Sequence, residues 1–325
     1  MTFEMTDIMK VPHIEWAIST LNNSGYYIET VKPELILDTA WSQVCRFQTK
    51  LGLIYLKKVP SALFLEANVI ELLRKKFDAP VPHLLGQNQN QHCFLMQDAG
   101  IPLHDFFKQK YNADILIEAI HHYTMLQFNI SDKTNLFLDL GVPDWRLNRL
   151  PQLYRELITQ EELLLADGLM QNEIDKLKKL NIVLIEICEE LANFSIPETL
   201  SHCDFHEKNI LIDADTLQTT IIDLGEVAIS HPFFSLNNCL HMVYERFGLT
   251  DAHYKQLQKT CLQPWLHFES EANLWEILSL IQKVWSIHAV LGEYRLLQSI
   301  DTSIFPLLQR EGRLAKKLRH WHHQF

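Results

Sequence analysis

The sequence predicts an α+β fold with a small strand-rich part followed by a larger helical part. Up to residue 97, short apolar runs alternate with turn residues, which is typical of strands joined by tight turns. After Pro102, the apolar residues recur at helical spacing, as they do over residues 113–128. A chain of 325 residues is long enough to form two cores. We therefore expect two domains, over residues 1–97 and 98–325.

Composition and charge argue against several classes of function. A formal net charge of -11 disfavours a nucleic-acid partner, which would select a basic surface. No apolar run reaches the length of a membrane span, and Met1–Lys10 mixes acids with apolar residues, unlike a signal peptide. The cysteines show no CxxC spacing, so neither a disulfide framework nor a zinc site is expected. We expect a cytoplasmic protein without a membrane or nucleic-acid partner, and the sequence leaves its oligomeric state open.

The elements expected up to residue 97 are strands accompanied by two helices. Ile14, Ala17 and Leu21 form one helical stripe, and Leu63 and Ile70 belong to a second. Proline-rich sequence after the second helix interrupts the chain before the next strands. The expected bounds are a helix within 1–25, strands at 26–31, from Val44, at 53–59, 83–86 and 93–96, and a helix over 61–76.

The second part is expected to be helical except around one hairpin. Its helices should cover residues 103–110, 113–128, 172–194, 275–297 and 313–321, with a further helix starting near Arg146. The last of these helices is basic and amphipathic. We expect it to dock on the acidic body of the protein rather than to bind a membrane or a nucleic acid.

The stretch Ser201–Glu226 combines a polar loop with a short hairpin. A loop-like run, HCDFHEKN, is followed by the apolar runs Ile210–Ile212 and Thr220–Ile222. The polar residues between these runs have the composition of a turn. A hairpin formed in this way would bring Asp223, at its far end, near Asn209 at the end of the loop.

Two carboxylates and an amide in one crevice favour phosphoryl transfer, a reaction that needs positioning and charge neutralisation more than covalent help. Asp223 and Asn209 are expected to hold Mg²⁺, which prefers oxygen ligands and keeps several waters. Asp204 is expected to accept the proton of the attacking hydroxyl. His202 is expected to pack beneath the loop and to fix its shape. The spacing H-x-D-x-x-x-x-N is weak by itself, and the hairpin with the following Asp-Leu-Gly strengthens it.

The run HCDFHEKN followed by IIDLG resembles the aminoglycoside phosphotransferase and choline kinase family, small-molecule kinases with a protein-kinase-like fold. The resemblance implies a small β-rich N-lobe that binds nucleotide and a larger helical C-lobe with the catalytic loop and substrate pocket. It also implies ATP and Mg²⁺ as cofactors and a small hydroxyl compound as substrate. The match is strongest over residues 202–223, moderate over 41–66 and weak toward the C-terminus.

The resemblance further implies a lysine on a strand that touches the nucleotide phosphates. Tyr55–Lys58 fits that strand, but neighbouring residues on a strand face opposite ways. The family's usual strand ending places the lysine at Lys57 rather than at Lys58. In protein kinases a helix glutamate pairs with this lysine, and Glu66 is positioned to do so.

Two further nucleotide contacts are implied by the same resemblance. Thr39–Ser42 fits the family's Ser-containing version of the phosphate loop, in which backbone N–H groups and the Ser42 hydroxyl would hold the phosphates. The segment from Met96 to Asp98 and beyond corresponds to the hinge between the lobes, whose backbone would read the adenine edge.

One departure from the family pattern follows the hairpin. The family commonly has Gly-Asp-Pro and then an Asp a few residues later, at the head of a helix, which braces the catalytic loop from below. The analogous positions here are His231 and Ser235. Without this Asp the sequence leaves the rigidity of the catalytic loop open, and Ser235 can cap the helix instead.

Three functions compete. The first is an ATP-dependent small-molecule kinase, the second a kinase-fold nucleotide-binding regulatory or interaction protein with little or no turnover, and the third a protein kinase. The complete set of Asp204, Asn209 and Asp223 favours the first over the second. The lack of a glycine-rich loop and of a segment ending in Ala-Pro-Glu disfavours the third.

The substrate stays open between an amino alcohol, an aminoglycoside and a sugar. A choline-like ammonium would need an aromatic cage, for which Trp275, Trp285 and Tyr294 are available, although aromatics at this spacing are typical of a core. The acids available for an amine-rich substrate include Asp144, Glu269 and Glu271.

Overall fold

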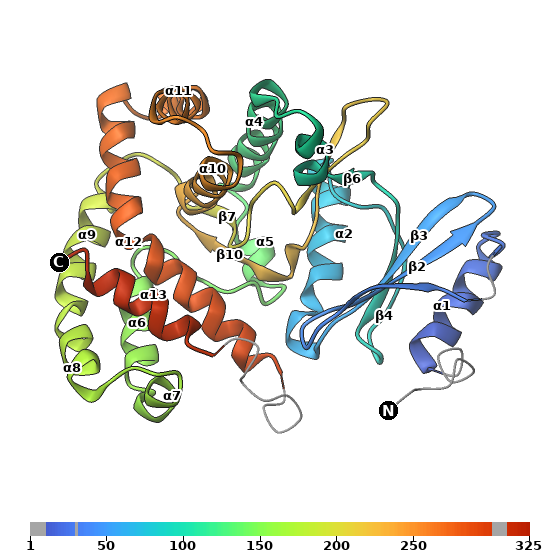
Figure 1. The fold of residues 1–325 in the computed structure, drawn as a ribbon, viewed down its shortest axis with the longest axis horizontal. Helices are drawn as coiled ribbons and strands as arrows, with labels where there is room; N and C mark the ends of the chain where they lie inside the picture. Colours follow the sequence, from blue (N-terminus) through green and yellow to red (C-terminus); the bar gives the residue numbers. More distant parts are fainter. Residues whose placement is uncertain (1–10, 30–31, 301–310) are drawn as a thin grey trace. The chain divides into compact units, whose positions relative to one another are not determined.

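The structure of the protein, a computed structural model, describes residues 11–29, 32–300 and 311–325. The chain forms two units (Figure 1), the first made of Met1–Ile101 with Ile212–Gly225 and the second of Pro102–Leu211 with Glu226–Phe325. A β-sheet dominates the first unit and helices dominate the second, which confirms the predicted α+β class. Each unit is described by itself, and the expected domain division at residue 98 stays a prediction.

An antiparallel five-stranded sheet forms the body of the first unit. In the central strand β3, Ile54 and Leu56 point toward one face of the sheet, and Tyr55 and Lys57 point toward the other. The strands lie in the order β1-β2-β3-β5-β4, with β1 at Glu34–Asp38, β2 at Gln43–Thr49, β3 at Gly52–Lys58, β4 at Leu84–Asn88 and β5 at Cys93–Gln97.

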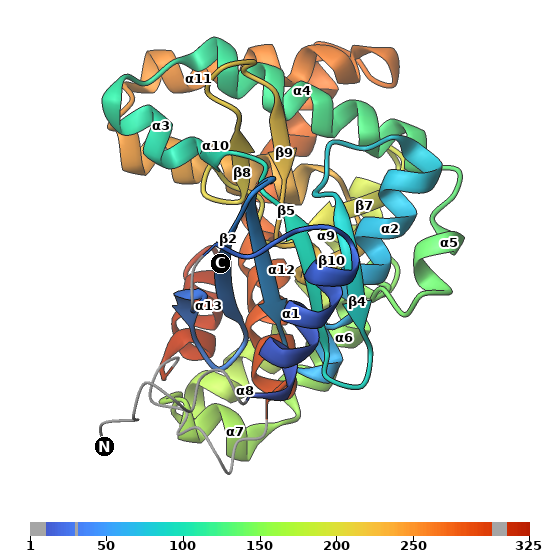
Figure 2. The same ribbon diagram turned by 90° about the vertical axis from the view of Figure 1, so that its right-hand side faces the viewer.

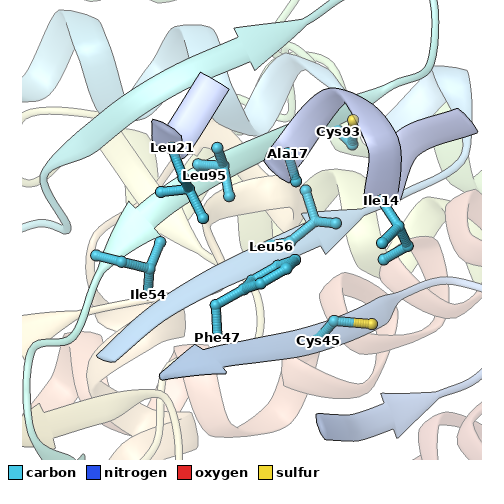
Figure 3. Close-up of a cluster of buried hydrophobic side chains, with 9 residues drawn as sticks. All are labelled: Ile14, Ala17, Leu21, Cys45, Phe47, Ile54, Leu56, Cys93 and Leu95. Atoms are coloured by element: carbon cyan, nitrogen blue, oxygen red, sulfur yellow. The ribbon is translucent and has the colours of Figure 1, made fainter. Parts of the chain in front are cut away.

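Helix α1 (Pro12–Asn23) covers one face of this sheet (Figure 2). Its stripe of Ile14, Ala17 and Leu21 packs on apolar side chains of the strands, and burial of this apolar area holds the helix in place (Figure 3). The strand-borne members of the cluster are Cys45, Phe47, Ile54, Leu56, Cys93 and Leu95.

Two expectations near the N-terminus need revision. The helix expected within residues 1–25 begins at Pro12, a residue favoured in the first turn, and residues 1–10 lie outside the described part of the chain. In place of the strand expected at 26–31, Ile28 forms an isolated bridge with Thr49, and residues 30–31 are not described.

Helix α2 (Leu65–Phe77) lies on the other side of the sheet from α1 (Figure 1). The helix expected over 61–76 is split, because a 3-10 turn at Ser61–Leu63 follows Pro60 and precedes α2. The helix ends at Asp78, whose left-handed φ of 47° closes its last turn. In the proline-rich segment after α2, the carbonyl of Pro80 accepts a hydrogen bond of 2.7 Å from the amide of Ile221.

The strands of the expected hairpin are both present. They are β8 (Ile210–Ile212) and β9 (Thr219–Ile221), followed by a 3-10 turn at Leu224–Glu226. Within the first unit, the amide of Asp213 donates to the carbonyl of Gln218 at 3.0 Å and closes the turn.

The second unit is a helical assembly around the two-stranded sheet of β7 (Thr199–His202) and β10 (Val227–Ser230). A short strand β6 (Ile101–Pro102) leads into it. Its helices are α3 Leu103–Gln109, α4 Ala113–Ile130, α5 Asn135–Leu138, α6 Leu150–Ile158, α7 Glu161–Ala166, α8 Gln171–Lys179, α9 Asn181–Ala192, α10 Phe233–Phe247, α11 Asp251–Leu262, α12 Glu271–Gln298 and α13 Arg313–His322, with a 3-10 turn at Gln263–His267.

The single helix expected over residues 172–194 is two helices, α8 and α9. The chain turns at Leu180, whose amide donates to the carbonyl of Leu177, three residues back, instead of continuing the α-helical ladder. Each half then buries its own stripe, with Ile174 and Leu177 in α8 and a separate set in α9.

The basic helix α13 docks on the second unit, as expected. Its apolar side is buried, while the Arg319 guanidinium forms two hydrogen bonds, of 2.7 and 2.9 Å, with the Glu173 carboxylate. The Asp167 carboxylate accepts the amides of Gly312 and Ala315 at 2.9 and 2.8 Å, at the start of the helix. Among the described residues, every helix is too short or too polar to cross a membrane.

Candidate active site

In the first unit, Lys57 is enclosed by two carboxylates. Its ammonium Nζ lies 2.9 Å from Glu66 Oε1 and 2.6 Å from Asp223 Oδ1. Lys57 and Glu66 are 7% and 2% exposed, whereas Lys58 is exposed on the opposite side of β3. The expected pairing of Lys57 with Glu66 is therefore present.

Electrostatics keep this lysine charged. Burial by itself lowers the pKa of Lys57, but the carboxylates of Asp223 and Glu66 outweigh burial, and the pKa is raised above its ordinary value. Burial raises the pKa of Glu66, while Lys57 and the amide of Leu224 act in the opposite direction by stabilising its ionised form. The buried cation is thus held in one place by β3, α2 and the segment that begins with Asp223.

Asp223 has a backbone conformation that few side chains adopt. Its φ of 62° lies in the left-handed region, which Asp and Asn tolerate better than other residues with a Cβ. The next turn brings Gly225 so close to α2 that a Cβ on it would lie 3.4 Å from Glu66 Oε2. The backbone after β9 therefore aims the Asp223 carboxylate at Lys57.

The predicted phosphate loop is a tight turn closed by Thr39. The Thr39 hydroxyl accepts the amides of Trp41 and Ser42 at 3.3 and 3.0 Å. The Ser42 hydroxyl is buried and has no hydrogen-bond partner among the described residues. That orphaned hydroxyl fits a polar ligand, whereas the two amides would have to leave Thr39 before they could bind phosphate.

The predicted hinge begins inside strand β5. Met96 pairs with Tyr55 of β3, and the amide of Asp98 donates to the carbonyl of Leu53 at 3.1 Å. The Asp98 carboxylate accepts the amide of Gly100 at 3.3 Å. The Asp98 amide is already used in this hydrogen bond, and the adenine contacts expected from Met96 and Asp98 stay predictions.

In the second unit, the catalytic-loop candidates surround the Asp204 carboxylate. Asn209 Nδ2 donates to the carbonyl and to Oδ2 of Asp204, at 2.9 and 3.1 Å. His206 Nε2 lies 3.3 Å from Asp204 Oδ1. His206 Nδ1 accepts the amide of Lys208 at 3.1 Å, so the ring proton is on Nε2 and donates to Asp204. The carboxylate is held at both oxygens and stays half exposed.

His202 lies beneath the loop, as expected. It is fully buried at the end of β7, and its Nδ1 accepts the amide of Asp204 at 3.2 Å. The expected cap by Ser235 is wrong, because Ser235 lies inside the first turn of α10 and makes no cap hydrogen bond there. Its hydroxyl instead contacts the backbone amide and carbonyl of His202 at 2.9 and 3.1 Å. The backbone of His202 is therefore supported from the position at which the family's Asp is missing.

Three residues near the loop support it in a way that was not expected from the sequence, in which His206 and Glu207 are alternatives to Asp204 as the base. His206 stands two residues after Asp204, and that spacing was its only signal. Tyr123 lies on α4, and its hydroxyl accepts the amide of His202 at 2.9 Å, a contact that no local pattern indicates. Glu207 is fully buried and binds both His104 Nδ1, at 2.9 Å, and Arg246. These side chains fix the loop from three sides.

Most candidate substrate-binding side chains already have partners. The Trp285 ring faces Lys317 Nζ at 5.8 Å, so a cation of the chain occupies the face that an ammonium would need. Asp144 binds Arg146 through two hydrogen bonds. Glu269 accepts the amide of Ser195, and Glu271 pairs with Lys259 at 3.0 Å.

The two expected metal ligands carry oxygen atoms of the kind that Mg²⁺ binds, Asn209 in the second unit and Asp223 in the first. Asn209 uses its amide nitrogen for Asp204, which leaves its oxygen Oδ1 as the atom that can bind a cation. Asp223 supplies a carboxylate with a side chain that is 41% exposed. Within residues 11–29, 32–300 and 311–325, no cluster of three His, Cys, Asp or Glu offers a metal site. Mg²⁺ needs few protein ligands, and the metal site expected from Asn209 and Asp223 stays a prediction.

The sequence matches the model of the phosphotransferase enzyme family over residues 34–265, most of the chain. The chain belongs to this family, which confirms the resemblance stated above. The protein is accordingly a phosphotransferase that uses an alcohol group as acceptor. A comparison with curated proteins finds no match.

Solved structures show the same fold. A Plasmodium vivax ethanolamine kinase is 15% identical with a TM-score of 0.61, covering 96% of this chain and 87% of its own. An aminoglycoside phosphotransferase from Streptomyces rimosus in complex with ADP and streptomycin is 17% identical, with a TM-score of 0.54 and coverage of 86% and 98%. A Streptococcus pneumoniae choline kinase is 13% identical, with a TM-score of 0.55 and coverage of 94% and 99%. The predicted protein-kinase-like fold is thereby confirmed.

Proposed function

We propose that the protein is an ATP-dependent kinase that transfers the γ-phosphate to a hydroxyl of a small molecule, such as an amino alcohol, an aminoglycoside or a sugar. The observation that carries the proposal is the Asp204 carboxylate, which is half exposed and held by Asn209 and His206. A carboxylate held in one orientation can accept the proton of a substrate hydroxyl and aim its oxygen. The similarity to a structure with bound ADP supports ATP as the donor.

The residues divide the work between binding and proton transfer. Lys57, kept charged by Glu66, would bind the nucleotide phosphates, with the Ser42 hydroxyl as a further donor. Asn209 and Asp223 would hold Mg²⁺, which supplies positive charge against the phosphates when bound. Asp204 would act as the base toward the substrate, and His202 would position it. The hinge around Met96 and Asp98 would bind the adenine.

The proposed substrates follow from the family and from the similar structures. The similar structures include an ethanolamine kinase, a choline kinase and an aminoglycoside phosphotransferase bound to streptomycin. All three kinds of substrate present an alcohol group. No observation favours the alternative of a regulatory protein without turnover, because the base, the lysine and both metal-ligand candidates are all present.

The proposal is tested by measuring ATP consumption with Mg²⁺ over a panel of amino alcohols, aminoglycosides and sugars. Wild type should consume ATP with at least one compound and release a phosphorylated product. Asp204→Asn is the matched control, since it keeps the shape and removes the charge. It should lose at least about a hundredfold in kcat while still binding ATP. A wild type that binds ATP with Mg²⁺ but phosphorylates nothing in the panel would contradict the proposal.

A further inference from the structure

Strand β7, which leads into the catalytic loop, has one edge that no strand of the described residues covers. It pairs with β10 on one side, with His202 opposite Val227 and Leu200 opposite Ile229. The next hydrogen bond on that side runs from the amide of Cys203 to the carbonyl of Glu226. In an antiparallel pair, alternate residues point their backbone groups away from the partner strand, and here these are Leu200 and His202.

Side chains of two helices take the place of the missing strand. Helices α4 and α10 lie beside β7 (Figure 1). Tyr123 of α4 donates its hydroxyl to the carbonyl of Leu200 at 3.1 Å and accepts the amide of His202 at 2.9 Å. Gln127, one turn further along α4, donates to the same carbonyl of Leu200 at 3.0 Å.

The Ser235 hydroxyl of α10 completes the arrangement. It accepts the amide of His202 at 2.9 Å and donates to the carbonyl of His202 at 3.1 Å. Ser201 Oγ lies 2.9 Å away and can donate to it. One donated and two accepted hydrogen bonds use the full capacity of a hydroxyl. Ser201, His202 and Ser235 are at most 1% exposed, so water does not compete for these groups.

The same hydroxyls are connected to Asp204 through His202. The backbone of His202 is held from both helices, and its ring nitrogen Nδ1 accepts the amide of Asp204. Tyr123 also packs its ring on Phe205, with centroids 4.3 Å apart. Burial raises the pKa of Tyr123, so its hydroxyl stays protonated and keeps donating to Leu200.

We propose that Tyr123 and Ser235 are positioning residues that share the amide of His202 and thereby hold Asp204 in its productive orientation. The proposal rests on the proposed role of Asp204 as the base. Because two hydroxyls accept one N–H, removing either leaves the other in place. The two substitutions should therefore be strongly non-additive, which a pair of independent structural contacts would not be.

The test compares Tyr123→Phe, Ser235→Ala and the double variant with Ser230→Ala. The control removes an equally buried serine hydroxyl, which donates to the carbonyl of Trp145 at 2.8 Å and does not touch the loop. Amide hydrogen exchange over residues 200–206 is measured without substrate. Exchange at His202 should accelerate slightly in each single variant, because one of the two acceptors is lost and the other remains. In the double variant it should accelerate by more than the product of the two single effects, and in Ser230→Ala it should not change.

Turnover is then measured with the best substrate of the ATP-consumption panel. Each single variant should lose about threefold or less in kcat, and the double variant about a hundredfold or more, with the KM for ATP nearly unchanged. Equal losses in Ser230→Ala, or a double loss no larger than the product of the single losses, would overturn the proposal. If the double variant does not fold, unchanged exchange at His202 in both single variants would overturn it as well. A wild type without turnover would refute the proposed function, while the exchange data still decide whether the two hydroxyls hold His202.

Discussion

At the scale of single residues, Lys57 and Lys58 show how one position separates a site residue from a surface residue. Ile54 and Leu56 of β3 face α1. Lys57, the next residue along the strand, faces the opposite way, toward Glu66 of α2. Lys58 lies on the other side of the strand and is exposed. The two lysines have the same chemistry, and only their surroundings differ.

We predict that Lys57→Ala weakens ATP binding at least about tenfold, whereas Lys58→Ala leaves it unchanged. Lys57→Ala should also lower the melting temperature of the free protein, because Glu66 is then a buried carboxylate without its cation. Adding Glu66→Ala removes that charge and should restore part of the stability but not the affinity. Titration calorimetry and thermal melting measure the two effects separately, and a larger affinity loss in Lys58→Ala would contradict the assignment.

We predict that Asp223→Asn abolishes the Mg²⁺-dependent part of the stabilisation by ATP. Asn tolerates the left-handed backbone that Asp223 adopts, so the substitution removes the charge without straining the chain. The melting temperature of the free protein should change little, because a partly exposed ion pair contributes little stability. Melting curves with ATP, with and without Mg²⁺, provide the measurement. An ATP shift with Mg²⁺ equal to that of wild type would show that Asp223 does not hold the metal.

At the scale of elements, the segment after β5 passes very close to strand β8. Gly100 has a φ of 104°, and a Cβ added to it would lie 2.1 Å from the carbonyl oxygen of Ile212. Both residues belong to the first unit. The hinge candidate can therefore lie this close to strand β8 only because position 100 is a glycine, which has no Cβ.

We predict that Gly100→Ala destabilises the protein by about 1–3 kcal/mol more than Gly52→Ala does. Gly52, in the β2–β3 turn, also has a positive φ, of 111°, but no atom lies within 4 Å of its added Cβ. Gly52→Ala is therefore the control, because it places an alanine at a positive φ without a clash between its Cβ and a neighbouring atom. Urea unfolding of both variants gives the difference, and equal losses would mean that the segment can move away from β8 at no cost.

At the scale of the whole molecule, two buried imidazoles link stability to pH. Burial lowers the pKa of His231 and of His288 to about 3. His288 stacks on Phe234 with ring centroids 4.3 Å apart, and His231 Nδ1 accepts the amide of Phe233. Both rings stay neutral in the folded protein, whereas in the unfolded chain they bind protons below about pH 6.5.

We predict that each of these histidines costs about 1.4 kcal/mol of stability between pH 7.5 and pH 5.5. The folded pKa is depressed, so the contribution is complete above the unfolded value and is lost as the pH falls toward the folded value. His231→Asn keeps an acceptor for the Phe233 amide and cannot titrate. Urea unfolding at the two pH values should show a smaller loss in this variant than in wild type. An identical loss would mean that His231 takes up no proton on unfolding.

Much of this molecule could be predicted from short stretches of sequence. The apolar stripe of α1, the strands from β2 to β5 and the run HCDFHEKN are local patterns, and each formed the element it indicated, whereas the strand expected at 26–31 is absent and β1 was not expected. The division of the helix at Leu180 was not predictable, because no proline or glycine marks it and only packing of the two halves decides it. The role of Ser235 was misread for a similar reason, since its position suggested a helix cap.

The sequence by itself determined the chemistry of the site: a carboxylate, an amide and a second carboxylate at fixed spacing, with a lysine and a glutamate upstream. Tertiary structure decided which lysine is buried, because the face that α2 covers depends on contacts between distant segments. It also decided that Tyr123 supports His202, two residues 79 positions apart whose meeting no local periodicity encodes. Local patterns arise because side chains repeat their direction at a fixed residue period in strands and helices. The hydrogen-bond partners of a buried backbone group in β7 depend instead on which helix side chains reach the open edge of that strand.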